Sequence, residues 1–407
     1  MNFVIIKASN IRGVIMQNFV YDIPTKVYFG KNQIERLPEL IHRFGKRVLL
    51  TYGGGSIKRN GLYDRVKELL ADCEIYELGG IDPNPRIESV REGAKLCKLH
   101  HIDVILAVGG GSTIDCSKVI AAASKYDGDA WDLVADSSKI KDALPLIDIL
   151  TLSATGTEMN TGGVITNFET KEKKGTGAYV LYPYASICDP TYTFTVPKNQ
   201  TAAGTADIMS HTFEIYFNRE EGVFVQDRLA EGILKACIHY LPIALEQPDN
   251  YEARANLMWS STMALNGITS IGRPGPWTCH PIEHMLSAYY DITHAVGLAI
   301  LTPRWMSYIL NEETVDRFAM YAHNVWGIPY QADQFSMAKE AIEKTYQFFV
   351  DAGLPMTLPE VEIDEEYFEE MAERVEPRLT NSYVPLTKDE VVTILKDCMT
   401  SGVTYQH

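Results

Sequence analysis

The chain has 407 residues, of which 46% are hydrophobic and 22% are charged, and this composition is that of a globular protein large enough for two domains. Its 37 basic and 53 acidic residues give a formal net charge of −16, which disfavours nonspecific binding to nucleic acid. No run of about 18 apolar residues is present, so no membrane span is predicted. The seven cysteines are scattered and form no CxxC pair, which indicates reduced thiols in a cytoplasmic protein.

The first half of the chain alternates between short apolar strands and helices. Residues 1–15 lack a signal-peptide pattern, and we expect this N-terminal extension to be dispensable. Strands and helices then alternate. A first strand is predicted to end near Gly30, and further strands are predicted at Val48–Tyr52, Glu74–Leu78, Asp103–Val108, Leu144–Ala154 and Ala185–Pro190. A hairpin is predicted at Ile165–Val180. Near-continuous apolar strands separated by helices predict a parallel sheet with helices on its faces, which we assign to an α/β domain over residues 16–197.

The second half of the chain has a helical period almost throughout. Beyond a change of composition near Pro197, helices are predicted at Asp227–Tyr240, Tyr251–Leu265, Glu283–Tyr290, Trp305–Leu310, Val315–Val325, Ala332–Ala352, Glu365–Val375 and Lys388–Met399. Residues 198–407 are therefore expected to form an all-α domain.

Two glycine triplets follow apolar strands and precede helices, at Gly53–Gly55 and at Gly109–Gly111. Glycine lets backbone N–H groups approach a phosphate closely, and a helix N-terminus favours its negative charge. Each triplet alone is also compatible with a plain tight turn, but two on neighbouring strands favour one dinucleotide at the carboxyl ends of the sheet. The first turn has no acid and is followed by Lys58 and Arg59, which favours NADP(H), with NAD(H) as the alternative.

Four of the ten histidines lie in two segments of the chain, and one of these segments also has an aspartate one helical turn before its histidine. Asp207 and His211 are one helical turn apart, as are His280 and His284, and His294 follows a helix end predicted at Asp291. One carboxylate with several imidazoles suits a divalent metal such as iron or zinc. The competing interpretation is a set of core or surface histidines that do not act together.

Several stretches together resemble the iron-containing (group III) alcohol dehydrogenases. They are Ser186–Glu214, Trp277–Gly297, Gly109–Lys118 and Thr151–Glu158. The resemblance extends over nearly the whole chain from about Met16, and within the family it is strongest to bacterial butanol dehydrogenases and NADPH-dependent aldehyde reductases. Many members have glycine where this chain has Ala295. The resemblance implies an N-terminal Rossmann-like α/β domain and an all-α C-terminal domain, the dehydroquinate synthase-like fold.

The resemblance also implies a role for individual residues. The metal ligands would be Asp207, His211, His280 and His294, holding Fe²⁺ or alternatively Zn²⁺, while His284 would serve as a catalytic residue beside the nicotinamide. The resemblance implies that four groups of residues would each hold one part of the cofactor. Gly53, Gly54, Gly55 and Ser56 would lie at the adenosine end, and Gly110, Gly111, Ser112 and Asp115 at the pyrophosphate. Thr151 and Thr155 would lie at the nicotinamide half, and Asn84 at the ribose next to the nicotinamide.

These features together predict hydride transfer between NADP(H) and a small aliphatic alcohol or aldehyde, such as butanol or its aldehyde. Two alternatives remain open on the residues alone: a metal- and NAD-dependent lyase like dehydroquinate synthase, and a nucleotide-binding module without activity. The lyase would need a basic cluster for an anionic sugar acid, and the sequence has none near His280–His294. No nucleic-acid or membrane partner is expected, and a homodimer is left open.

Overall fold

A parallel sheet forms the centre of the first half of the protein. The computed structural model describes residues 16–273 and 275–405, so the predicted extension 1–15 lies outside the described residues. Six described strands pair in the order β1-β8-β5-β4-β2-β3, and every pair is parallel. The strands are β1 (Lys26–Phe29), β2 (Arg47–Tyr52), β3 (Glu74–Leu78), β4 (Val104–Gly109), β5 (Leu146–Leu150) and β8 (Ala185–Cys188).

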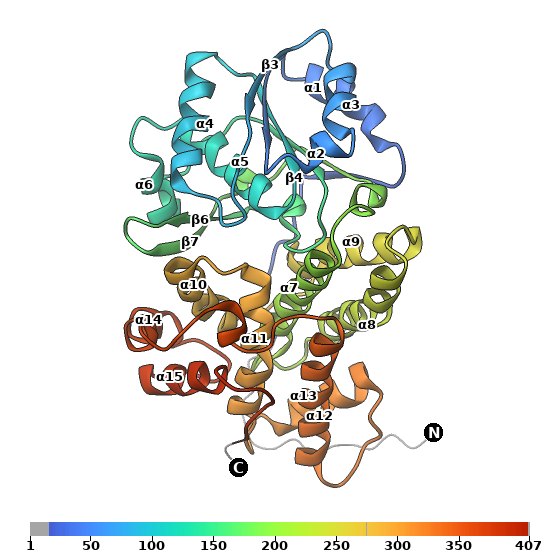
Figure 1. The fold of residues 1–407 in the computed structure, drawn as a ribbon, viewed down its shortest axis with the longest axis vertical. Helices are drawn as coiled ribbons and strands as arrows, with labels where there is room; N and C mark the ends of the chain where they lie inside the picture. The colour runs from blue at the N-terminus through green and yellow to red at the C-terminus, as the bar shows by residue number, and fades with distance from the viewer. Residues whose placement is uncertain (1–15, 274, 406–407) are drawn as a thin grey trace.

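Helices cover both faces of this sheet (Figure 1). They are α1 (Leu37–His42), α2 (Ser56–Arg59), α3 (Leu62–Leu69), α4 (Ile87–Leu99), α5 (Gly111–Ala123) and α6 (Ala130–Ala135). One apolar cluster joins one face to α4 and α5 through residues such as Val90 and Ile120, and a second joins the other face to α1 and α3 through Leu37 and Val66. Because both faces are covered, β4 and β5 are buried along their whole length, as their continuous apolar sequences predict.

The carboxyl ends of β2 and β4 bring the two glycine turns side by side. Tyr52 pairs with Val108, and each strand leads directly into its glycine triplet. Gly55 has φ 86°, a conformation that favours glycine, and precedes α2. Gly111 opens α5, and a Cβ there would lie 2.4 Å from Thr155 Oγ1, so a larger residue would collide with the loop after β5.

The predicted hairpin is present with different bounds. It consists of β6 (Gly162–Asn167) and β7 (Glu172–Gly177), which pair antiparallel outside the main sheet. The hairpin lies at the lower edge of the α/β half, and β7 packs against α10 (Cys279–Tyr290) of the helical half (Figure 1). It therefore brings residues of the first half against the helices that follow.

The second half is helical, as the periodicity predicts. Its helices are α7 (Lys198–Tyr216), α8 (Phe224–Glu246), α9 (Tyr251–Leu265), α10 (Cys279–Tyr290), α11 (His294–Ile309), α12 (Val315–Trp326), α13 (Gln334–Asp351), α14 (Phe368–Val375) and α15 (Lys388–Asp397). Several predicted helices were too short. The helix α8 extends beyond the predicted Asp227–Tyr240 at both ends, α10 begins before Glu283, and α11 begins at His294 rather than at Trp305. The chain leaves α10 through Asp291, whose φ of 54° is left-handed, so the predicted end of that helix is confirmed.

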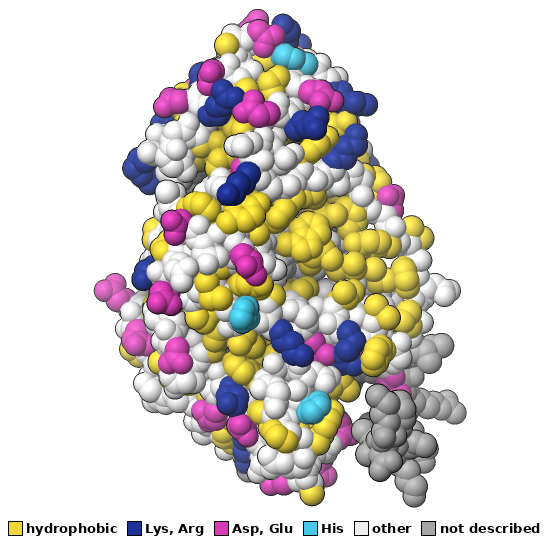
Figure 2. Space-filling view, turned by 90° about the vertical axis from the view of Figure 1, so that its right-hand side faces the viewer, with side chains coloured by type: hydrophobic (Ala, Val, Ile, Leu, Met, Phe, Trp, Pro, Cys, Tyr) yellow, Lys and Arg dark blue, Asp and Glu magenta, His cyan; other side chains and the backbone are white. Residues whose placement is uncertain are grey.

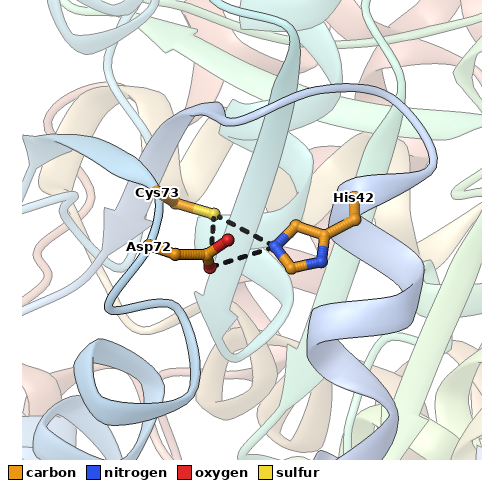
Figure 3. A group of neighbouring side chains, drawn as sticks. All are labelled: His42, Asp72 and Cys73. Carbon is orange, nitrogen blue, oxygen red and sulfur yellow. Dashed lines mark hydrogen bonds and ion pairs between the residues drawn. The ribbon is translucent and has the colours of Figure 1, made fainter.

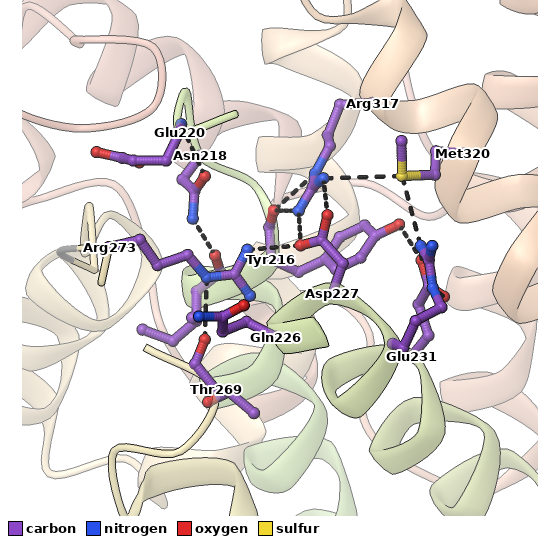
Figure 4. A network of polar contacts seen from close by, with 12 residues as sticks. Tyr216, Asn218, Glu220, Gln226, Asp227, Glu231, Thr269, Arg273, Arg317 and Met320 are labelled. Atoms are coloured by element: carbon purple, nitrogen blue, oxygen red, sulfur yellow. Dashed lines mark hydrogen bonds and ion pairs between the residues drawn. The ribbon is translucent and has the colours of Figure 1, made fainter. Parts of the chain in front are cut away.

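The long helix α7 is fixed at its carboxyl end by a buried ionic network (Figure 4). Asp227 accepts hydrogen bonds from Arg273 (2.6 Å) and from both terminal nitrogens of Arg317 (2.6 and 2.7 Å). Arg317 Nε also donates to the carbonyl oxygen of Tyr216, the last residue of α7, at 2.8 Å. A cation at a helix carboxyl end is favourable, and this network holds the helix that carries Asp207 and His211.

Charged and apolar side chains both occur on the surface, and apolar side chains gather across the middle of one side of the molecule (Figure 2). Figure 2 shows this on the side where α8 and α9 lie in Figure 1. The exposed rings of Phe29 in β1 and Trp259 in α9 meet edge to face, with centroids 5.7 Å apart. No helix in the described residues has the length and apolar character that a membrane span requires.

Candidate metal and cofactor site

A cavity of about 1590 Å³ lies between the α/β half and the helical half. Its walls contain the carboxyl ends of β2, β4 and β5 on one side and residues of α7, α10 and α11 on the other. Nearly all the site residues predicted from the sequence line this one cavity: Gly53, Gly54, Ser56, Asn84, Gly110, Gly111, Ser112, Asp115, Thr151, Thr155, Asp207, His211, His280, His284 and His294. Gly55 does not line it; its backbone instead forms the turn that precedes α2.

Asp207 lies at the centre of a group of histidines from three helices. Its Oδ1 is 3.4 Å from His211 Nδ1 and 3.8 Å from His280 Nε2. The same oxygen is 3.9 Å from His294 Nε2. The donor atoms of Asp207, His280 and His294 all lie within 4.8 Å of one another. Helical spacing on α7 brings Asp207 and His211 together, and His294 joins them because the left-handed turn at Asp291 ends α10 and lets α11 begin beside it.

The unpaired polar atoms of this group point to a cation. Asp207 Oδ1, His211 Nδ1 and His280 Nε2 are buried and have no hydrogen-bond partner among the described residues. Burying such atoms without partners is costly, and a divalent metal would satisfy them together. Carboxylate oxygen and imidazole nitrogen form a donor set suited to iron or zinc. The residues present therefore fit a metal.

The protonation of the group supports the same interpretation. Burial lowers the pKa of His211 to about 4, so this imidazole is neutral. Burial also acts to lower the pKa of His280, but the neighbouring carboxylates of Asp207 and Glu214 raise it to about 9. Burial acts to raise the pKa of Asp207, yet the neighbouring imidazoles, His211 foremost, lower it to about 2. Without metal, one imidazolium therefore partly balances the Asp207 carboxylate, and a bound cation would displace its proton.

Two buried carboxylates behind the group were not recognised from the sequence. Glu214 Oε1 lies 3.1 Å from His280 Nδ1, and the Glu214 carboxylate also accepts the backbone N–H groups of His280 (2.8 Å) and Thr278 (2.7 Å). Glu283 accepts from His294 Nδ1 in the same manner. A carboxylate at Nδ1 directs the lone pair of Nε2 toward a metal. Glu214 lies three residues after His211 on α7, and that spacing was an available signal.

Lys173 of β7 is a third residue of the site that was not recognised from the sequence. Its side chain is 4% exposed, and its ammonium group contacts Asn84 Oδ1 (3.0 Å), Ser287 Oγ (3.0 Å), Glu283 Oε2 (3.4 Å) and His294 Nδ1 (3.2 Å). It balances the charge of Glu283, which is fully buried. The hairpin therefore supplies the counter-ion for a carboxylate beside the metal group of the helical half, an arrangement that depends on chain segments far apart in sequence.

His284 lies on the cavity wall one turn after His280. Its ring centroid is 6.4 Å from that of His280 and 5.5 Å from that of His294. Burial, with the charge of Lys173, lowers the pKa of His284 well below the usual value, so His284 is a neutral imidazole. Its buried Nδ1 has no partner among the described residues and is available to a ligand.

The two cations after the first glycine turn lie differently. Arg59 lines the cavity. Lys58 does not, because its ammonium group lies over the rings of Tyr52 (4.8 Å) and Tyr63 (4.7 Å). Of the two cations that favoured NADP(H) in the sequence, only Arg59 therefore lies on the cavity wall, because the neighbouring aromatic rings attract the charge of Lys58.

The predicted cofactor residues Asn84 and Asp115 also hydrogen-bond to other parts of the protein. The amide nitrogen of Asn84 donates to Asp291 Oδ1 (2.8 Å) and to the carbonyl of Ile292 (3.1 Å), so Asn84 joins the α/β half to the end of α10. Asp115 accepts from Thr157 Oγ1 (2.5 Å) and from the backbone N–H of Val164 (2.9 Å). Both line the cavity, but these hydrogen bonds show that they also fix its walls.

The two halves of the chain match two family models that belong together. Residues 24–190 match the model described as iron-containing alcohol dehydrogenase, and residues 201–399 match the C-terminal model of the Fe-containing alcohol dehydrogenase family. The chain belongs to the iron-containing alcohol dehydrogenase family. The predicted dehydroquinate synthase-like fold is confirmed by structures of this family.

Relatives in this family match almost the entire chain. NADH-dependent butanol dehydrogenase A of Clostridium acetobutylicum is 55% identical, over 94% of this chain and 99% of the relative. NADPH-dependent aldehyde reductase YqhD of Escherichia coli is 40% identical, over 86% and 90%. The crystal structure of NADH-dependent butanol dehydrogenase A from Thermotoga maritima has a TM-score of 0.90 and 39% identity, covering 95% of this chain and 100% of that chain.

Membership of the iron-containing alcohol dehydrogenase family decides between the activities considered from the sequence. The protein is an oxidoreductase that acts on CH–OH groups, an alcohol dehydrogenase or aldehyde reductase that uses a metal and a nicotinamide cofactor. The lyase and the inactive binding module are therefore set aside.

Proposed function

We propose that this protein transfers hydride between NADP(H) and a small aliphatic primary alcohol or aldehyde, at a metal held by Asp207, His211, His280 and His294. The observation that carries the proposal is the convergence of unpaired, buried donor atoms of Asp207, His211 and His280 in the same cavity as both glycine turns. The helical unit 198–407 would hold the metal and substrate, and the α/β unit 16–197 would hold the cofactor.

When bound, the metal supplies a Lewis acid for the substrate oxygen and the nicotinamide supplies or takes up the hydride. Fe²⁺ is the metal we favour from the family, with Zn²⁺ as the alternative. Glu214 and Glu283 would hold His280 and His294 with their Nε2 atoms toward the metal. His284, neutral and with an unpaired Nδ1, would hydrogen-bond substrate or water and pass on the hydroxyl proton.

The cavity wall near the histidines is suited to an aliphatic substrate. Trp277 stands edge to face against His280, with ring centroids 5.0 Å apart. Leu265, Leu354 and Val361 also line the cavity. An apolar wall of this kind favours a short hydrocarbon chain over a strongly polar substrate.

We infer that the first glycine turn accepts the 2′-phosphate of NADP(H). The turn Tyr52–Ser56 contains no acid that would repel this group, and Arg59 lines the adjoining cavity. NAD(H) is the second candidate, because the 55% identical relative is named as NADH-dependent and the 40% identical one as NADPH-dependent.

The outer strand β1 suggests how a homodimer would form. Among the described residues β1 pairs only with β8, so its other edge is open, and the exposed ring of Phe29 in this strand packs against the exposed ring of Trp259. Open edges with apolar neighbours tend to pair. A monomeric mass in light scattering at micromolar concentration would contradict this part of the proposal.

The proposed activity is tested by following cofactor absorbance with butyraldehyde and a panel of aldehydes of other lengths and charges. The proposal predicts cofactor oxidation with short aliphatic aldehydes, reversal with the corresponding alcohols, and higher kcat/KM with NADPH than with NADH. Absence of turnover with every aldehyde in a metal-replete sample would contradict it.

A further inference from the structure

Three side chains with metal-binding atoms meet on the surface of the α/β half, away from the cavity (Figure 3). His42 is the last residue of α1, and Asp72 and Cys73 form the turn between α3 and β3. This turn lies at the amino end of β3, whereas the cofactor cavity lies at the carboxyl ends of the strands. Six of the seven cysteines are buried, and Cys73 is the half-buried exception.

The distances among the three donor atoms resemble those around a tetrahedral ion. His42 Nε2 lies 3.1 Å from Asp72 Oδ1, and Cys73 Sγ lies 3.7 Å from His42 Nε2 and 3.8 Å from Asp72 Oδ1. Tetrahedral Zn²⁺ with ordinary bond lengths would separate sulfur from nitrogen or oxygen by about 3.5 Å, and nitrogen from oxygen by about 3.3 Å. The observed separations differ from these values by a few tenths of an ångström.

We propose that His42, Asp72 and Cys73 form a second metal site, which binds a thiophilic divalent cation such as Zn²⁺ with water as its fourth ligand. Thiolate, imidazole and carboxylate together select zinc-like ions over magnesium or calcium. The bound ion would join the end of α1 to the turn that begins β3. Binding would release the thiol proton of Cys73, and His42 would carry its remaining ring proton on Nδ1.

Lys46 sets the affinity of this site. Its Nζ lies 2.6 Å from Asp72 Oδ2, the carboxylate oxygen that the ion would not use. The Lys46 ammonium group pairs with the Asp72 carboxylate, and its positive charge opposes an incoming cation.

The test uses the full-length protein with its active-site metal in place, titrated with Co²⁺ and followed by near-ultraviolet absorption. Thiolate ligation to Co²⁺ gives a charge-transfer band there that imidazole and carboxylate ligands do not. We expect one equivalent of Co²⁺ to produce the band and Zn²⁺ to displace it. Cys73→Ser should abolish the band, and His42→Ala should weaken Co²⁺ binding at least tenfold, both with unchanged aldehyde reduction.

Two further variants make the test specific. Lys46→Gln should tighten Co²⁺ binding, because it removes the opposing charge without removing a ligand. Asp207→Asn, which alters the active-site group, should leave the thiolate band intact. A band that survives in Cys73→Ser, no band at millimolar Co²⁺, or weaker binding in Lys46→Gln would each overturn the proposal.

Discussion

Glu214 Oε1 lies 3.1 Å from His280 Nδ1, and the same carboxylate accepts the backbone N–H of His280. Both residues are buried. The carboxylate therefore fixes the ring and directs its unpaired Nε2 toward Asp207. Removing a carboxylate that holds a metal-binding histidine in place typically lowers metal affinity by about 10–100-fold.

Glu214→Gln is expected to lower metal affinity by about 10–100-fold while the protein stays folded. The glutamine keeps the size of the side chain, and its oxygen can still accept one hydrogen bond, but the charge that stabilises the oriented imidazole is gone. Metal retention against a competing chelator measures the change. Glu221→Gln, an exposed substitution just beyond α7, is the control. Equal retention in both variants would show that Glu214 does not position His280.

Lys173→Met is expected to destabilise the folded protein by about 3–5 kcal/mol, because it leaves the buried Glu283 without its counter-ion. Denaturant unfolding of the two purified proteins measures the free energy. Lys174→Met is a matched control on the next residue of the hairpin, where Lys174 pairs with Glu172 on an exposed surface. The interpretation fails if the two variants unfold at the same denaturant concentration.

Gly53→Asp is expected to reverse a preference for NADPH, because the new carboxylate would repel the 2′-phosphate and bind a free 2′-hydroxyl. The position has room: a Cβ at Gly53 would lie 3.4 Å from the Ile81 carbonyl oxygen and 3.6 Å from Thr113 Oγ1, both ordinary contacts. The ratio of kcat/KM values for the two cofactors should change by about tenfold or more. Equal values for both cofactors in the unsubstituted protein would refute the assignment of NADP(H).

The alternation of apolar strands, helices and glycine turns was sufficient to predict the parallel sheet. The start of α11 was missed for a physical reason. This helix is apolar on nearly every side and contains Pro303, so it has neither an amphipathic period nor an uninterrupted helical sequence. Tertiary packing decides its extent.

Site residues one helical turn apart were recognisable, whereas those joined by the tertiary fold were not. Asp207 with His211 and His280 with His284 have a spacing that a sequence reveals. Lys173 meets Glu283 and Asn84 meets Asp291 across more than a hundred residues. Likewise, nothing in the sequence distinguished Lys58 from Arg59, because the rings that attract Lys58 come from β2 and α3.

His280→Ala and His284→Ala separate a metal ligand from a proton-transfer residue. His280→Ala should lose metal and activity together. His284→Ala should retain near-stoichiometric metal, because four protein ligands remain, while kcat falls by about 10²–10⁴-fold or changes its pH dependence. Elemental analysis beside kcat against pH makes the comparison. Purification of His284→Ala without metal would mean that His284 is itself a ligand.

The central claim is that aldehyde reduction depends on a metal in the Asp207 group, and removal and restoration of that metal tests it most directly. The purified protein is stripped with a chelator, its metal content is measured, and butyraldehyde reduction is followed with each nicotinamide cofactor before and after addition of Fe²⁺ or Zn²⁺. The account predicts loss of activity in step with loss of metal, recovery with one equivalent of added ion, and no recovery in Asp207→Asn. Full activity in a sample without metal would contradict it.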